Sequence, residues 1–246
     1  MHTSDPLTVG EIARRSGFAE SAVRYYEGLG RAAAQALARR GWSLIVDARR
    51  ADDLAAAMRG LADVVTVPGD VTDPRHRADL AAAAGRAGGL DLLVNNASRL
   101  GPSPQPELLA YPLAELSQVY QTNVFAPLAL IQLLAGPLSS AAGTVINVSS
   151  DAAVDAYPGW GGYGSAKAAL DQLTAVLAAE LPALRCYAFD PGDMRTDLHQ
   201  QAFPGEDISD RPEPDGAAQA LLRLLAHRPP SGRYRASELT EPAVAR

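Results

Sequence analysis

Residues 143–150 read GTVINVSS, and residues 161–181 read GGYGSAKAALDQLTAVLAAEL. The first stretch is almost continuously apolar and rich in β-branched residues, which predicts a strand buried on both faces. The second stretch carries its apolar residues at helical spacing and predicts a long helix. A doubly buried strand followed by a helix is the repeating unit of a parallel sheet that helices cover.

The same alternation runs along most of the chain. We expect helices over 31–40, 51–60, 74–87, 113–134, 161–181 and 215–228, and strands over 42–47, 64–70, 90–96, 143–150 and 184–190, with a short edge strand at 232–236. Short links and right-handed crossovers predict an α/β fold, a Rossmann-like doubly wound parallel sheet with helices on both faces. Ligands of such sheets bind beyond the carboxyl ends of the strands.

Composition narrows the class of protein. The 246 residues are 47% hydrophobic, enough for one main domain, and the net charge of −6 argues against a nucleic-acid or anionic membrane surface as the main partner. The single cysteine, Cys186, excludes an internal disulfide, is expected to be a buried hydrophobe, and suits the cytoplasm. The longest apolar stretch, Phe125 to Leu138, is too short to cross a bilayer and predicts a buried helix.

One basic residue differs from all the others. Lys167 is the only lysine beside 21 arginines, and it follows Tyr163 by four positions, so both side chains lie on one helical face. A free phenol titrates near pH ~10, and a cation within a few Å lowers that by roughly 1–3 units, towards useful acid/base strength. Ser150 ends the preceding strand and places a hydroxyl at the same edge. The alternatives are a leftover lysine on a solvated face and a serine that only caps the next segment.

A serine followed by Tyr-x-x-x-Lys resembles the active site of the short-chain dehydrogenase/reductase family. Four further stretches match motifs of that family: GDVTD at 69–73, NNAS at 95–98, QTNV at 121–124 and PGDMRT at 191–196. The resemblance covers about residues 28–246. It implies an oxidoreductase that transfers a hydride between NAD(P)(H) and a small carbonyl or alcohol substrate.

The resemblance also implies a role for each catalytic residue. Tyr163 would pass a proton to or from the substrate oxygen, and Ser150 would hydrogen-bond that oxygen. Lys167 would lower the pKa of the phenol and bind the nicotinamide ribose, and Asn123 would hold a water linking Lys167 to solvent. The implied cofactor-binding residues are Gly28, Leu29, Gly30, Arg49, Asp70, Val71, Asn96, Ala97, Tyr163, Lys167, Pro191, Gly192 and Thr196. Metal-ligand spacing is not apparent, and we expect no metal.

The choice of cofactor depends on the residues after the second strand. An acidic residue there binds the ribose 2′-hydroxyl of NAD, whereas an arginine accommodates the 2′-phosphate of NADP. Ala48 occupies the acidic position and Arg49 follows it, which favours NADP. Asp47 comes one residue early, so strand alternation turns it to the other face. Glu27 stands where many NADP-preferring members carry a basic residue, so NAD stays possible.

The N-terminus departs from the family. Val23 and Arg24 stand where the family has Thr-Gly, and no hydrophobic first strand precedes them. Residues 7–30 instead resemble the helix-turn-helix of MerR-type regulators, with a recognition helix from about Glu20 to Glu27. The chain is therefore divided into an N-terminal segment, 1–27, and a catalytic domain, 28–246. The segment lacks a basic footprint, so we do not expect nucleic acid as a partner.

An empty slot in the middle of the sheet would be costly. It would leave two rows of backbone groups unpaired, at about 1–3 kcal/mol per buried group. We therefore expect part of Phe18 to Tyr26 to fill the slot, making the first strand atypical. The alternative is a helical N-terminus, with a missing strand and a damaged sheet.

The sequence thus predicts an NADP(H)-dependent carbonyl reductase or alcohol dehydrogenase, and the resemblance implies a homodimer or homotetramer. Two other functions stay open: an impaired nucleotide-binding protein or sensor, and a MerR-like DNA-binding regulator fused to a dehydrogenase-like domain. The polar segment Asp193 to Asp215 is expected to be a mobile loop over the site. His76 and His227 are expected on solvated helix faces, and Trp160 is expected either to line a pocket or to pack.

Overall fold

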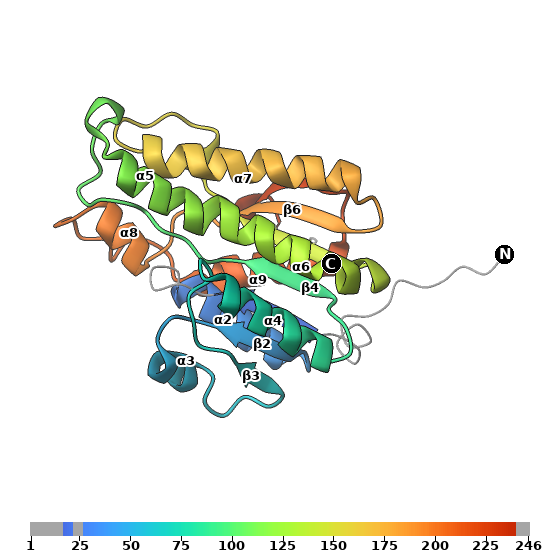
Figure 1. The fold of residues 1–246 in the computed structure, drawn as a ribbon. Coiled ribbons are helices and arrows are strands. Elements are labelled where there is room, and N and C mark those ends of the chain that lie inside the picture. Colours follow the sequence, from blue (N-terminus) through green and yellow to red (C-terminus); the bar gives the residue numbers. More distant parts are fainter. Residues whose placement is uncertain (1–16, 22–26, 240–246) are drawn as a thin grey trace, which may run out of the picture.

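A parallel sheet lies between two layers of helices (Figure 1). The computed structural model describes residues 17–21 and 27–239. The strands of this part are β1 Gly17–Ser21, β2 Ser43–Asp47, β3 Val64–Thr66, β4 Leu92–Asn95, β5 Thr144–Val148, β6 Arg185–Asp190 and β7 Gly232–Arg235. They run in the order β3-β2-β1-β4-β5-β6-β7, and every neighbouring pair is parallel. The predicted doubly wound α/β fold is confirmed.

Strand β1 fills the central slot. Phe18 lies opposite Leu44 of β2 on one side and Leu92 of β4 on the other. The prediction that part of Phe18 to Tyr26 occupies this position is therefore confirmed for the residues up to Ser21. The strand forms because the facing backbone groups of β2 and β4 need hydrogen-bond partners, a demand that outweighs local propensity.

The same strand corrects the MerR-type interpretation. Glu20 and Ser21 pair with both neighbouring strands, so the predicted recognition helix cannot begin at Glu20. Residues 1–16 and 22–26, on which the rest of that resemblance depends, lie outside the described residues. The division of the chain at 27/28 stays a prediction, although β1 belongs to the same sheet as the later strands.

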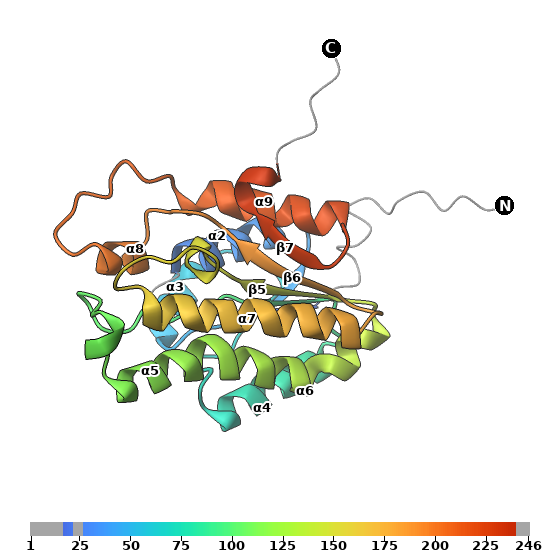
Figure 2. The ribbon, with the colours of Figure 1, turned by 90° about the horizontal axis from the view of Figure 1, so that it is seen from above.

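The helices form two layers, one on each face of the sheet (Figure 2). Helices α2 and α9 pack together on one face, and α4, α6 and α7 cover the other. The helices of the described part are α2 Glu27–Ala38, α3 Ala51–Ala57, α4 Pro74–Arg86, α5 Leu113–Tyr120, α6 Ala126–Ser140, α7 Gly161–Glu180, α8 Asp197–Ala202 and α9 Pro214–His227, with 3₁₀ turns η1 Leu108–Ala110, η3 Asp151–Ala153 and η4 Ala236–Glu238 and a π turn η2 Gln121–Phe125. Helix α8 lies within the segment 193–215, which the sequence predicts only as a loop.

Helices α5 and α6 join through the π turn into one helical segment, Leu113–Ser140. This segment extends beyond the predicted end at residue 134. By length and composition it could cross a membrane, but half of its most apolar window is buried inside the protein. It packs against α4, α7 and the sheet, as a core helix does. Cys186 on β6 is also buried, as predicted, and burial raises the pKa of its thiol to about 11.

Candidate active site

Ser150 lies just beyond the carboxyl end of β5. Its Oγ accepts a hydrogen bond from the backbone N–H of Ala152 at 3.2 Å and donates one to Asp151 Oδ1 at 2.9 Å. The first contact makes Ser150 the N-cap of the 3₁₀ turn η3. Ser150 therefore caps the turn η3 and is also the candidate catalytic serine, so the two interpretations do not exclude each other.

Tyr163 and Lys167 face the same edge of the sheet from the first two turns of α7. Both side chains are buried, and the Lys167 Nζ lies 5.5 Å from the centre of the Tyr163 ring. Lys167 Nζ donates a hydrogen bond to the carbonyl oxygen of Val148 at 2.7 Å, which fixes the lysine against the end of β5. Burial lowers the pKa of Lys167 to about 8, and the negative charge of Asp171 opposes this shift. The interpretation of Lys167 as a leftover on a solvated face is wrong.

A glycine lets α7 approach Ser150 closely. A Cβ atom at Gly164, next to Tyr163, would lie 2.6 Å from the carbonyl oxygen of Ala152 in η3. That oxygen belongs to the backbone and cannot turn away. Gly164 thus sets the distance between the helix that carries Tyr163 and the turn that Ser150 begins.

We expect Gly164→Ala to lower kcat roughly 10- to 100-fold, because a displacement of about 1 Å at a reacting group can have an effect of that size. Steady-state kinetics of NADPH oxidation measures this change in kcat. The matched control is Gly136→Ala on α6, where an added Cβ meets nothing within 4 Å. An equal loss of kcat in both variants would contradict the close-packing argument.

Asn123 lies in the π turn that joins α5 to α6 and is fully buried. Its Oδ1 accepts a hydrogen bond from the Arg99 backbone N–H at 2.7 Å, and its Nδ2 donates one to the Arg99 carbonyl at 2.9 Å. The side chain therefore ties the π turn to the segment after β4, which contains Asn96 and Ala97. π turns often occur at functional sites because they free a backbone carbonyl from the helical pattern.

A buried chain of amides holds this part of the fold in register. Asn95 on β4 donates to Asn147 on β5 at 2.7 Å, and Asn147 donates to Thr174 on α7 at 2.8 Å. The sequence reveals Asn147 only as a polar residue inside an apolar strand, a pattern that indicates a buried hydrogen-bond partner. This chain joins the two strands to the helix that carries Tyr163 and Lys167.

A small cavity of about 40 Å³ opens at the carboxyl ends of β5 and β6. Its lining includes Ser150, Tyr163, Pro191, Gly192, Thr196, Trp160 and His199. Five of the predicted site residues thus meet at one cavity. Trp160 is expected from the sequence either to line a pocket or to pack against other side chains, and it does both. It lines the cavity, and its ring centre lies 5.9 Å from that of Tyr163.

His199 is a lining residue that the motifs did not indicate. It lies on α8, inside the segment predicted as a loop, and its Nε2 accepts a hydrogen bond from Arg211 Nε at 3.3 Å. Burial lowers the pKa of His199, although the charge of Asp193 opposes this. Neutral imidazole is therefore the favoured form at neutral pH.

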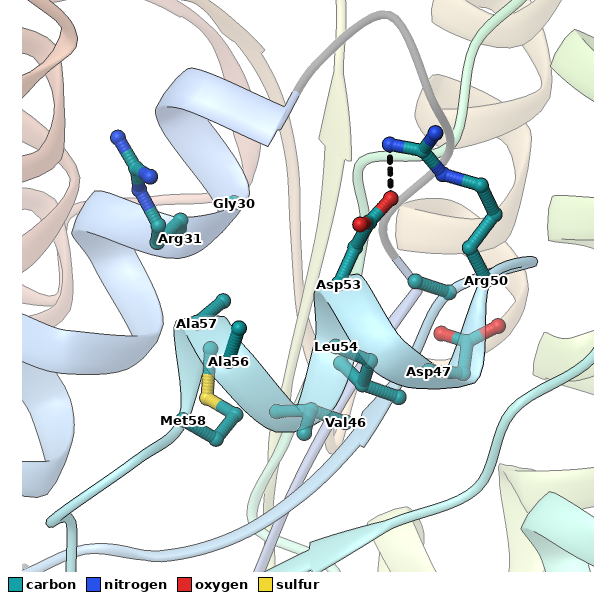
Figure 3. A pocket seen from close by; sticks show the side chains of 11 residues that line it. Gly30, Arg31, Val46, Asp47, Arg50, Asp53, Leu54, Ala56, Ala57 and Met58 are labelled. Atoms are coloured by element: carbon teal, nitrogen blue, oxygen red, sulfur yellow. Dashed lines mark ion pairs between the residues drawn. The ribbon is translucent and has the colours of Figure 1, made fainter.

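A second cavity, of about 310 Å³, lies between α2, α3 and the end of β2 (Figure 3). Gly30 and Arg50 are among its lining residues, and Arg50 forms an ion pair with Asp53 of α3. Arg49, the arginine to which the sequence assigns cofactor choice, is partly buried. Among the described residues, Arg50 rather than Arg49 lines this cavity.

The end of β2 also corrects one prediction. His76 on α4 is buried, not solvated, and its Nε2 lies 3.1 Å from Oδ2 of the buried Asp47. Asp47 thus contacts α4, but it is also among the residues that line the cavity beside β2, so strand alternation does not turn it fully away from that cavity. Gly69 is required beside this pair, because a Cβ there would lie 2.2 Å from the ring of His76. His227 is exposed, as predicted.

The remaining cofactor-site candidates belong to the first turn of α2 or follow the carboxyl ends of β3 and β4. Gly28 packs closely, since a Cβ there would lie 2.6 Å from Pro214 and 3.1 Å from Thr196, and Leu29 is buried in the core. Asp70 Oδ1 accepts hydrogen bonds from the Thr72 backbone and hydroxyl. The buried Val71 packs with Ala97 and Ala126.

A parallel α/β sheet with cavities at the carboxyl ends of its strands has the architecture of dinucleotide-binding proteins. In a comparison with protein families, residues 25–207 match the short chain dehydrogenase family. The matched stretch begins after β1. This chain belongs to the short-chain dehydrogenase family.

Relatives with known activities support the assignment. Serine 3-dehydrogenase of Rhizobium radiobacter is 35% identical over 178 residues, which cover 70% of each chain. Sepiapterin reductase of Mus musculus is 38% identical over 114 residues, which are 45% of this chain and 44% of that protein. The chain thus spans less than half the length of the sepiapterin reductase it matches. A short chain dehydrogenase of Shigella flexneri, solved in complex with NADP, has the same fold, with a TM-score of 0.80, 24% identity and coverage of 90% of this chain and 97% of that one.

Proposed function

We propose that this protein is an NADP(H)-dependent reductase or dehydrogenase that interconverts a small carbonyl compound and its alcohol. The observation that carries the proposal is the meeting of Ser150 and Tyr163 at one cavity, with Lys167 buried behind the tyrosine ring. Serine 3-dehydrogenase and sepiapterin reductase, by their names, act on an alcohol and a carbonyl compound respectively. The same chemistry suits a cavity that presents the hydroxyl groups of Ser150 and Tyr163 beside the aromatic side chain of Trp160.

In the proposed mechanism, NADPH supplies the hydride when bound. Tyr163 donates its phenolic proton to the carbonyl oxygen of the substrate and takes it back in the reverse direction. The Lys167 ammonium favours the phenolate that remains, because opposite charges attract strongly where water is excluded. Ser150 donates a hydrogen bond to the same substrate oxygen, for which its hydroxyl must turn away from Asp151. Asn123 keeps the π turn beside Lys167, where a water can connect the lysine to solvent.

The cavity beside β2 fits the adenosine end of a dinucleotide. It is concave, it lies at the carboxyl end of a parallel strand, and its lining includes Arg31, Arg50 and Gly30 of the first turn of α2. An arginine in this place suits the 2′-phosphate of NADP. We propose that Arg50 makes the main contact with that phosphate and that Arg49 adds to the positive charge. The remaining cofactor contacts proposed are Gly28, Leu29, Gly30, Asp70, Val71, Asn96, Ala97, Tyr163, Lys167, Pro191, Gly192 and Thr196.

Replacing Arg50 by serine should weaken NADPH binding roughly 10- to 100-fold, since a hydrogen bond to a charged group contributes about 1.5–3 kcal/mol. Binding of NADH, which lacks the 2′-phosphate, should change little. Calorimetric titration of both cofactors measures the two effects. Arg59→Ser, which removes the same charge from an exposed site beyond α3, serves as the control. Equal weakening for both cofactors would rule out the assignment of Arg50.

We also propose that the protein works as a cytoplasmic homodimer or homotetramer. Apolar side chains are exposed on the two long helical segments, at Leu113, Phe125 and Leu133 on α5–α6 and at Val176 on α7. A second copy would cover them through the same two segments. Light scattering coupled to gel filtration measures the mass; a single-chain mass at micromolar concentration would contradict the proposal.

Deuterium transfer tests the proposed reaction. NADPH deuterated at its transferable position would be incubated with sepiapterin and, separately, with simple aldehydes and ketones. We expect the alcohol product to gain one deuterium, which mass spectrometry detects, and we expect almost no product with Tyr163→Phe. Products that form equally fast with the variant would show that another residue transfers the proton.

A further inference from the structure

Arg233 on the edge strand β7 reaches the back of the candidate active site. Its Nε donates to Asp171 Oδ2 at 3.0 Å, and its Nη2 donates to Asp190 Oδ2 at 2.8 Å and to the backbone carbonyl of Ser150 at 2.9 Å. One guanidinium therefore joins α7, the end of β6 and the turn that follows β5. A planar guanidinium can donate these three hydrogen bonds in fixed directions, whereas the ammonium group of a lysine lacks that geometry.

Asp171 connects this arginine to the lysine. It follows Lys167 by four positions on α7, so the two side chains lie on the same face of the helix. Burial raises the pKa of Asp171, whereas the Ser149 hydroxyl, Arg233 and Lys167 all favour its charged form. Asp171 in turn favours the charged form of Lys167. Arg233, Asp171 and Lys167 thus form a row of alternating charges that ends behind Tyr163.

We propose that Arg233 is a positioning residue, which holds Asp171 as a carboxylate beside Lys167 and fixes the backbone of Ser150. The inference rests on the proposed roles of Lys167 and Ser150. In this arrangement Asp171 keeps the buried lysine protonated at neutral pH, and Arg233 keeps Asp171 ionised. Asp190 at the end of β6 is the second carboxylate that Arg233 contacts, and Tyr163, whose ring centre lies 5.5 Å from the Lys167 Nζ, is a further titratable neighbour of Lys167.

The single lysine of this chain permits a direct test without any substrate. Biosynthetic labelling with lysine carrying ¹³C at Cε gives one side-chain NMR signal, whose shift against pH reports the titration of Lys167 alone. We expect a wild-type midpoint of about 8. Asp171→Asn should lower the midpoint by about one pH unit, because a nearby opposite charge shifts a pKa by roughly 1–3 units. Arg233→Gln should lower it in the same direction.

The double variant separates the two contributions. If Arg233 acts through Asp171, Arg233→Gln should add nothing to the shift already produced by Asp171→Asn. Arg235→Gln is the matched control: Arg235 lies two residues along β7 and approaches Asp190 at 3.6 Å, so its loss should leave the midpoint of Lys167 unchanged.

An unchanged midpoint in folded Arg233→Gln would overturn the inference, whether or not the protein shows reductase activity. Should that variant not fold, an unchanged midpoint in Asp171→Asn would overturn it equally. Failure of the proposed function is a different result, since it appears as absent deuterium transfer in the wild-type protein and leaves the NMR titration intact.

Discussion

Replacing Tyr163 by phenylalanine should lower kcat roughly 100- to 10,000-fold, the usual contribution of a positioned general acid or base. The phenol is the proposed proton donor, and the Nζ of Lys167 lies 5.5 Å from the centre of its ring. The substitution removes a single oxygen from a buried ring that packs against Trp160, so we expect the fold to persist and NADPH binding to weaken far less than kcat falls. Rates of NADPH oxidation together with calorimetric binding of NADPH separate the two effects.

Tyr234→Phe provides the control for this substitution. Tyr234 lies on β7, and its hydroxyl donates to the carbonyl of Pro230 at 2.8 Å, away from the cavity. Its loss should leave kcat near the wild-type value. If Tyr163→Phe retained more than about a tenth of wild-type kcat, a loss smaller than general acid catalysis produces, Tyr163 would not be the proton donor.

Lys167→Met should lower kcat by a similar factor, roughly 100- to 10,000-fold at neutral pH, because the phenol of Tyr163 then behaves as an acid of ordinary strength. The pH dependence should change as well. In the wild type, the pKa of Lys167 is lowered to about 8, so the ammonium loses its proton and the activity falls as the pH rises through that value. The methionine variant carries no charge to lose, so its residual rate of NADPH oxidation should stay level through pH 8 and fall only near pH ~10, where the phenol itself loses its proton.

Lys167→Arg distinguishes charge from shape. A guanidinium stays protonated throughout the range, so the fall in activity near pH 8 should disappear. The larger, planar group does not fit the buried contact with the Val148 carbonyl, so kcat should still fall well below the wild-type value. A wild-type pH profile in this variant would show that Lys167 does not cause the alkaline limb.

The parts of the site that could be predicted from sequence depend on local geometry. Tyr163 and Lys167 share a helical face because their spacing is four, and Ser150 reaches the edge because it ends a strand. Asp171 could have been found by the same rule, since it follows Lys167 by four. The fold could be predicted because the strands from β2 to β6 are mostly apolar and alternate with helices along the chain.

The parts that could not be predicted depend on partners far away in sequence. Gly17–Ser21 has no strand pattern of its own and becomes a strand through its pairing with β2 and β4. His76 is buried because it meets Asp47, 29 positions earlier. Arg233 contacts the Ser150 carbonyl across 83 positions. Such contacts arise from the order of strands in the sheet, which no local window of sequence contains.

Titration of the wild-type protein with NADPH by calorimetry tests the central claim most directly. Gly28, Leu29 and Gly30 in the first turn of α2 are among the proposed cofactor contacts, and cofactor binding decides whether the residues around Lys167 can act. We predict one NADPH bound per chain, with NADH weaker by roughly 10- to 100-fold for lack of the contact with Arg50. The absence of binding by either cofactor would contradict the account.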